Sequence, residues 1–179
     1  EYAAAAQESL DATVAALGYF SRTLGPYPYP HVSVIVPPYN AFEAGGMEYE
    51  TFFTSAATNA FPFNAVGAAR FVSVHEFGHG YFMGLLASNE FEEPFLDEGL
   101  NEWWDNRTLE GQPWDMKTPA ALKFLGAKDF QLDGWLMERP SAAADRTPAD
   151  TIAGNSWHRW SSGSYGMVYG RTATAFQDL

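Results

Sequence analysis

The feature that most restricts how this chain can fold is a pair of histidines inside an apolar segment. Residues 65–86 are predicted to form one helix capped by Asn64, and apolar side chains on nearly all of its sides predict that it is buried. The letters HEFGH place His75 and His79 about 40° apart on one face of this helix, one turn from each other, with Glu76 beside them. Buried imidazoles and a buried carboxylate need polar partners, so the fold has to bring ligands or hydrogen-bonding groups to this face.

Two imidazoles with this spacing can hold one tetrahedral zinc ion, each at about 2.0–2.1 Å. Glu76 lies about 60° around the helix from His79, so it can face the metal's water as a general base without ligating the metal. A catalytic zinc takes a third protein ligand, and Glu98, nineteen residues after His79 at the start of the next predicted helix, is the candidate. The alternatives are ordinary core or surface histidines at 75 and 79, and a carboxylate at 98 that only complements the helix dipole.

Periodicity and Gly/Pro breakers predict the other elements of the chain. They are a helix at 1–24, strands at 31–36 and 47–53, and helices at 96–109, 119–125 and 165–179. Apolar residues give the first helix an amphipathic pattern; they are Leu10, Val14, Leu17 and Phe20. We expect one catalytic domain over 1–179, with a helix and β-sheet part at 1–63 and a helical zinc-binding part at 64–179.

Composition excludes several classes of function. The chain has 179 residues, a net charge of −12 and only ten basic residues, so a nucleic-acid partner is not expected. Without cysteine there are no disulfides and no thiolate zinc ligands. No apolar run has the length of a membrane-spanning segment. The acidic charge and the absent cysteines favour an exported, bacterial-type protein.

Four segments, taken in order, resemble the gluzincin aminopeptidases, the aminopeptidase N-like family that also includes leukotriene hydrolase. LGPYPY at 24–29 is similar to the family's FGPYPY, and GGMEY at 45–49 to its GxMEN exopeptidase motif. HEFGH at 75–79, followed after eighteen residues by Glu98, is similar to its HExxH…NEG pair. VYGRTA at 168–173 is similar to its YxKGA segment. Together the four segments cover nearly the whole chain.

The resemblance implies an α+β fold, a thermolysin-like zinc peptidase catalytic domain in which a small β-sheet packs against a predominantly helical lobe. It implies one Zn²⁺ ion in the cleft between these parts. It also implies that Glu48 binds the free amino group of a peptide, with Gly45, Gly46 and Met47 along the substrate, and that Tyr169 donates its hydroxyl to the oxyanion. Without the resemblance, Glu48 would be interpreted as a strand-surface residue and Tyr169 as a core tyrosine.

Two residues depart from the family pattern. Tyr49 stands where the family has Asn, and Arg171 stands where it has Lys, which keeps the charge but changes the hydrogen-bond geometry. We also expect a carboxylate to hydrogen-bond one of the zinc ligands. Asp105, seven residues after Glu98, is the candidate, and Glu102 competes for the same role.

The function expected from these observations is that of a zinc-dependent aminopeptidase, which hydrolyses the N-terminal residue of a peptide substrate. Two alternatives stay open: a zinc endopeptidase of the same fold, and a catalytically weak zinc-containing binding module. Enzymes of this family carry an N-terminal β-rich domain and a C-terminal helical domain, and neither is recognised in these 179 residues. The chain is therefore expected to be the catalytic part of a longer, multidomain enzyme.

Overall fold

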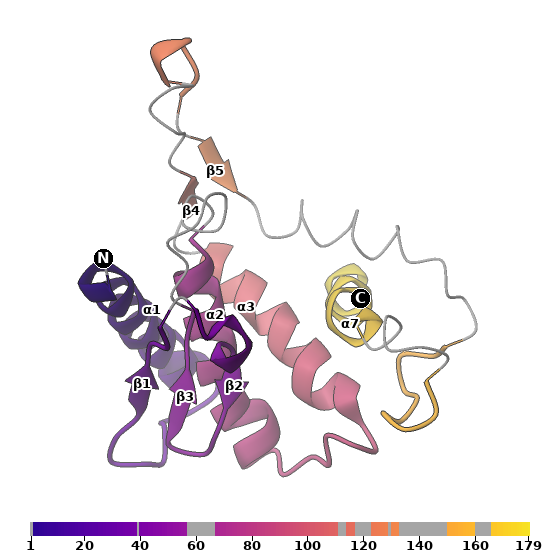
Figure 1. Ribbon diagram of the computed structural model, residues 1–179. Helices are drawn as coiled ribbons and strands as arrows, with labels where there is room; N and C mark the ends of the chain where they lie inside the picture. The colour runs from indigo at the N-terminus through magenta and orange to yellow at the C-terminus, as the bar shows by residue number, and fades with distance from the viewer. Residues whose placement is uncertain are drawn as a thin grey trace. The chain divides into compact units, whose positions relative to one another are not determined.

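The structure, a computed structural model, forms two compact units (Figure 1). The residues it describes are 2–38, 40–56, 67–110, 114–116, 123–128, 130–132, 150–159 and 166–179. The first unit comprises Glu1–Phe77 and Gly111–Leu132, and the second comprises Gly78–Glu110 and Asp133–Leu179. Helix α2 (Ala68–His79) passes through the boundary, so one continuous helix belongs to both units.

The first unit begins with helix α1 (Tyr2–Thr23), which confirms the predicted helix at 1–24. Its buried face is formed by small residues and one phenylalanine, namely Ser9, Ala12, Thr13, Ala16 and Phe20. Of the apolar residues in the predicted amphipathic pattern, Phe20 is buried, whereas Leu10 and Val14 are 51% and 60% exposed. Small side chains allow the helix backbone to pack closely, and the hydroxyls among them find hydrogen-bond partners in the core.

A three-stranded sheet follows, in the order β1-β3-β2. Strand β1 (Ser33–Ile35) pairs in parallel with β3 (Phe52–Thr54), and β2 (Met47–Glu48) pairs antiparallel with β3. The single strand predicted at 47–53 is therefore wrong, because the chain reverses at 49–51 and forms a hairpin. No Gly, Pro, Asn or Asp occurs at 49–51 to signal this turn in the sequence.

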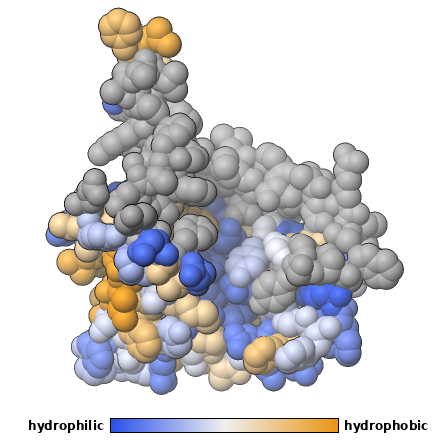
Figure 2. Space-filling view, viewed as in Figure 1, coloured by the Kyte–Doolittle hydropathy of each residue, from blue (hydrophilic) through white to orange (hydrophobic). Residues whose placement is uncertain are grey.

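The two faces of this sheet differ in polarity and burial. Glu48 and Phe53, which are cross-strand partners, lie on the buried face at 9% and 1% exposure. Met47 and Phe52 lie on the opposite face, where they are exposed together with Ile35. Figure 2 shows apolar side chains at the surface in this region of the first unit. The alternation along each strand therefore turns Glu48 inward.

Three buried serines join α1, the end of β3 and α2. The Ser55 hydroxyl lies 2.9 Å from the Ser9 hydroxyl and 2.8 Å from the Ser73 hydroxyl. Ser55 and Ser73 also donate to the carbonyl of Ala69, at 3.3 and 2.6 Å. Because all three side chains are fully buried, this cluster fixes the N-terminal half of α2 against the first unit.

The second unit is helical. After α2 the chain continues as the π-helical segment η2 (Gly80–Leu85), and a second π-helical segment, η3 (Phe95–Gly99), leads into α3 (Leu100–Glu110). Helix α7 (Met167–Asp178) packs against η3 and α3. The predicted helices at 96–109 and 165–179 are confirmed, and the one at 65–86 is confirmed from residue 68 onward. Its predicted cap, Asn64, lies outside the described residues.

A second hairpin in the first unit was not predicted. Strand β4 (Trp114–Met116) pairs antiparallel with β5 (Phe130–Leu132), in a region where the sequence predicted a helix at 119–125 and irregular chain from 126 to 163. Most of that helix lies outside the described residues. None of the helices in the described part of the chain combines the length and apolar character needed to cross a bilayer.

The serine cluster provides a test of the fold. Ser55→Ala removes the central hydroxyl, so the buried hydroxyls of Ser9 and Ser73 each lose a partner, and we expect the free energy of unfolding to fall by about 1–3 kcal/mol. Ser33→Ala, at an exposed position of β1, is the matched control and should change it by less than about 0.5 kcal/mol. Urea denaturation measures both, and equal effects would contradict the role given to the cluster.

Candidate metal centre

Helix α2 carries the first part of the site. His75, Glu76 and His79 are 8%, 6% and 1% exposed. Because all three belong to one continuous helix, their spacing follows from helix geometry: the two imidazoles lie one turn apart on the same face, as the sequence predicted. Beyond His79 the winding changes to the π-helix η2, and single π-turns inside helices occur frequently at functional sites.

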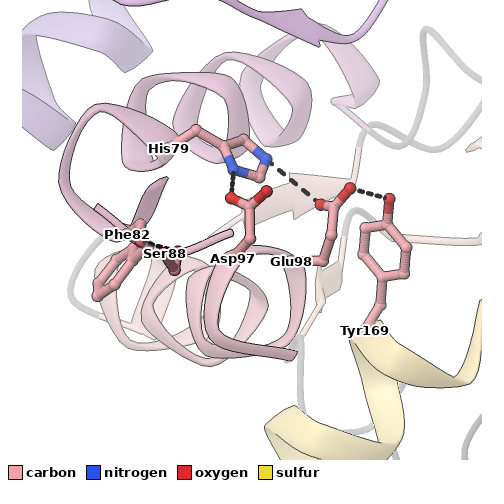
Figure 3. A network of polar contacts seen from close by, with 6 residues as sticks. All are labelled: His79, Phe82, Ser88, Asp97, Glu98 and Tyr169. Carbon is pink, nitrogen blue, oxygen red and sulfur yellow. Dashed lines mark hydrogen bonds and ion pairs between the residues drawn. The ribbon is translucent and has the colours of Figure 1, made fainter. Parts of the chain in front are cut away.

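Segment η3 brings two consecutive carboxylates to the ring of His79 (Figure 3). Asp97 Oδ1 lies 2.5 Å from His79 Nδ1, and Glu98 Oε2 lies 3.3 Å from His79 Nε2. His79 and Asp97 are each 1% exposed, whereas the Glu98 side chain is 12% exposed. A carboxylate on Nδ1 holds the ring proton there and leaves the Nε2 lone pair available to a metal.

The donor set fits a zinc ion. Helix α2 carries His75 one turn before His79, and in the second unit the carboxylate of Glu98 faces the His79 ring. Two ligands bound to a tetrahedral zinc at about 2.0–2.2 Å stand about 3.4 Å apart, and the distance of 3.3 Å between His79 Nε2 and Glu98 Oε2 matches that separation. Two imidazoles and one carboxylate are also the ligands of a known class of catalytic zinc sites that keep a fourth position open.

Tyr169 reaches the same carboxylate from helix α7. Its hydroxyl donates a hydrogen bond to Glu98 Oε1 at 2.5 Å, so the two oxygens of Glu98 face His79 and Tyr169 respectively. Residues 98 and 169 are 71 positions apart in the sequence, and only the packing of α7 against η3 joins them. The phenol of Tyr169 therefore belongs to the same cluster of polar side chains as His79, Asp97 and Glu98.

The residues predicted to bind substrate lie in the first unit, beside Glu76. Gly46 has a φ of 68°, and a Cβ built on it would stand 3.3 Å from Glu76 Oε1, so strand β2 starts in close contact with this carboxylate. Glu48 follows two residues later in β2 and lies on the buried face of the sheet. The Met47 side chain turns to the opposite, exposed face, so only its backbone is available on the Glu76 side. Gly45 lies in the bend that precedes this strand.

The predicted hydrogen-bond partners of the ligands are on α3. Asp105 and Glu102 are 0% and 8% exposed, and a hydrogen bond from either to a zinc ligand stays a prediction. The sequence reasoning missed Asp97, the partner of His79, although an acidic residue directly before Glu98 was a signal that could have been used.

A glycine inside the motif allows α2 and α3 to approach. A Cβ on Gly78 would stand 1.9 Å from Asn101 Oδ1 and 2.9 Å from Asn101 Cγ. Asn101 is fully buried, so its side chain has little room to retreat. The backbone next to His79 thus lies directly on the amide of Asn101, and this contact helps to set the distance between His79 and the segment that carries Asp97 and Glu98.

No family model matches this chain, and neither a curated protein nor a solved structure matches it. The resemblance to the gluzincins and the thermolysin-like fold therefore stay predictions made from the motifs. What the site can do follows from its own side chains.

Removing the carboxylate of Asp97 tests the metal centre. Asp97→Ala leaves His79 Nδ1 without the acceptor that orients the ring, so we expect the affinity for zinc to fall by about 10–100-fold, measured by competition with a chelator. Asp97→Asn keeps an acceptor oxygen and should retain more of the affinity. Asp178→Ala, at the exposed end of α7, is the control. Wild-type affinity in Asp97→Ala would contradict the role of this residue.

Proposed function

We propose that this chain is the catalytic part of a zinc-dependent metallopeptidase that acts as an aminopeptidase. One observation carries the proposal: the buried ring of His79 has the Asp97 carboxylate on Nδ1 and the Glu98 carboxylate on Nε2. All three residues lie in the second unit, and the same helix presents His75 one turn away. A carboxylate, an imidazole and a second acidic ligand in this order are typical of catalytic zinc sites.

In this proposal His75, His79 and Glu98 hold one zinc ion. When bound, the zinc supplies Lewis acidity, which lowers the pKa of a water molecule toward about 7 and polarises the carbonyl to be cleaved. The chain itself supplies the orientation of the ligands. Asp97 fixes the tautomer of His79, and the contact between Gly78 and Asn101 supports the close approach of the two helices that carry the ligands.

Glu76 is the proposed general base. It shares the buried helix with His75 and His79 but points to one side of them, so it does not compete for the metal. Its carboxylate would take a proton from the attacking water and deliver that proton to the amine leaving group. A positioned acid–base group of this kind contributes about 10²–10⁴-fold to the rate.

Tyr169 is the proposed donor to the oxyanion that forms when the carbonyl is attacked. Its hydroxyl already lies at a ligand carboxylate, 2.5 Å from Glu98 Oε1, so a short movement would bring it to an oxygen next to the metal. One preorganised donor of this kind is typically worth about 10²–10³-fold in kcat.

The region of strand β2 favours an aminopeptidase over an endopeptidase. Gly46, directly before this strand, lies close to Glu76, and Glu48 follows two residues later, with its side chain 9% exposed. A buried carboxylate in the same unit as the proposed base suits the ammonium group of a peptide's first residue, because the two charges satisfy each other away from water. An extended peptide laid along β2 would then present its first peptide bond to Glu76.

Glu76→Gln tests the general base. We expect hydrolysis of an aminoacyl reporter to fall by at least about 10²-fold, because an amide cannot accept the proton, while the protein still binds one equivalent of zinc by elemental analysis. Glu110→Gln, on the exposed side of α3, is the matched control and should keep full activity. Full activity in Glu76→Gln would refute the mechanism, and full zinc content without turnover in the wild type would favour the binding-module alternative.

Blocking the amino terminus of the substrate tests the exopeptidase role. A peptide with an acetylated first residue should be cleaved far more slowly than the free peptide, and Glu48→Gln should raise KM for the free peptide, because both changes remove the ion pair between the ammonium and Glu48. Mass spectrometry of the products identifies the bond that is cut. Cleavage of both peptides at equal rates would contradict the aminopeptidase proposal and favour an endopeptidase with the same zinc site.

A further inference from the structure

Gly99, the residue after Glu98, lies directly against helix α7. A Cβ built on Gly99 would stand 2.3 Å from the carbonyl oxygen of Val168, 2.4 Å from Thr172 Cβ and 2.6 Å from Thr172 Cγ2. Real Cβ atoms essentially never come within 3.0 Å of another heavy atom. The first of these neighbours is backbone and the second is fixed to it, so neither can rotate away, and no side chain fits at position 99 unless α7 moves.

The two α7 residues that contact Gly99 flank the tyrosine of the site. Val168 and Thr172 are one helical turn apart and are 0% and 1% exposed, so this turn of α7 is closely packed in the second unit. Tyr169 lies between them and reaches Glu98, the neighbour of Gly99, at 2.5 Å. The contact at Gly99 and the hydrogen bond at Glu98 thus join the same short stretches of η3 and α7.

We infer that Gly99 is a positioning residue: its missing side chain sets the distance between α7 and η3 at which the Tyr169 hydroxyl reaches Glu98. With alanine at 99, the Val168 oxygen would have to move from 2.3 Å to beyond 3.0 Å. A displacement of this size along the direction of the hydrogen bond would stretch it from 2.5 Å to beyond about 3.0 Å, the upper end of the usual O–H···O range, and weaken it. The catalytic consequence rests on the proposed function, since a donor misplaced by about 1 Å can cost 10²-fold in rate.

The test is a double-mutant cycle on the metal-free protein, which needs no activity. In the wild-type protein, which has glycine at 99, Tyr169→Phe removes a hydrogen bond to a carboxylate and should raise the unfolding equilibrium constant by about tenfold. In the Gly99→Ala background the same substitution should raise it by less than about twofold, because the hydrogen bond is already stretched and contributes little. An equal effect of Tyr169→Phe in both backgrounds would overturn the inference.

Gly84→Ala is the matched control. Gly84 lies in the other π-helical segment, η2, where a Cβ would meet nothing closer than the carbonyl oxygen of His79 at 3.6 Å, an ordinary contact. Tyr169→Phe should keep its full tenfold effect in this background. A loss of the effect here as well would show that any alanine in a π-helical segment uncouples Tyr169, and the specific role of Gly99 would fail.

A second variant covers the case in which Gly99→Ala does not fold. Thr172→Ser, added to Gly99→Ala, removes Thr172 Cγ2, one of the three atoms that a Cβ at 99 would meet, and keeps the Val168 oxygen and Thr172 Cβ, so it should separate the helices less than Gly99→Ala alone. The effect of Tyr169→Phe should then fall to an intermediate value. The full effect in the Gly99→Ala/Thr172→Ser protein would overturn the inference.

The zinc-loaded protein gives an independent readout. Gly99→Ala should leave the bound zinc at one equivalent and KM near the wild-type value, and it should lower kcat as much as Tyr169→Phe does. In the double variant, kcat should fall by less than about threefold below that of either single variant. If the fold losses in kcat of the two single variants multiply in the double variant, the two residues act independently and the inference is overturned. If the wild type has no peptidase activity, the proposed function fails, and the stability cycle on the metal-free protein still decides the role of Gly99.

Discussion

The structure of the site depends on a single buried ring, the imidazole of His79. It is 1% exposed and has a carboxylate at each nitrogen, Asp97 at 2.5 Å and Glu98 at 3.3 Å. Two carboxylates and an imidazole are too costly to bury unless they satisfy one another or share a cation. This requirement explains why η3, rather than any other segment of the second unit, lies against the C-terminal end of α2.

Glycines set the distances around that ring, since each lets a backbone approach a functional group where a Cβ would collide. A Cβ built on Gly46 would stand 3.3 Å from Glu76 Oε1, Gly78 allows the contact between α2 and Asn101, and Gly99 lies against the backbone of α7. Two of these glycines are sequence neighbours of site residues: Gly78 directly precedes His79, and Gly99 directly follows Glu98. The same close packing that stabilises the fold therefore also positions the side chains of the candidate site.

Local geometry next to the site is unusual in both segments that carry it. The helix of the motif changes to π winding directly after His79, and Glu98 lies inside the other π-helical segment. In both places the backbone departs from the regular i to i+4 pattern, which alters the directions of consecutive side chains. From segment η3, Asp97 and Glu98, neighbours in sequence, both approach the ring of His79, an arrangement that regular periodicity does not predict.

The sequence by itself determined the helix of the motif, the two imidazoles on one face and the carboxylate at 98, because helical periodicity and capping are local properties of the chain. Only the tertiary structure decided that Asp97 is the partner of His79, that Tyr169 bonds Glu98, and that α1 buries its small residues while Leu10 stays exposed. These features depend on contacts between segments far apart in the sequence. Which of the possible contacts between distant segments forms depends on side-chain packing, and the hydrophobic pattern of a single segment does not determine it.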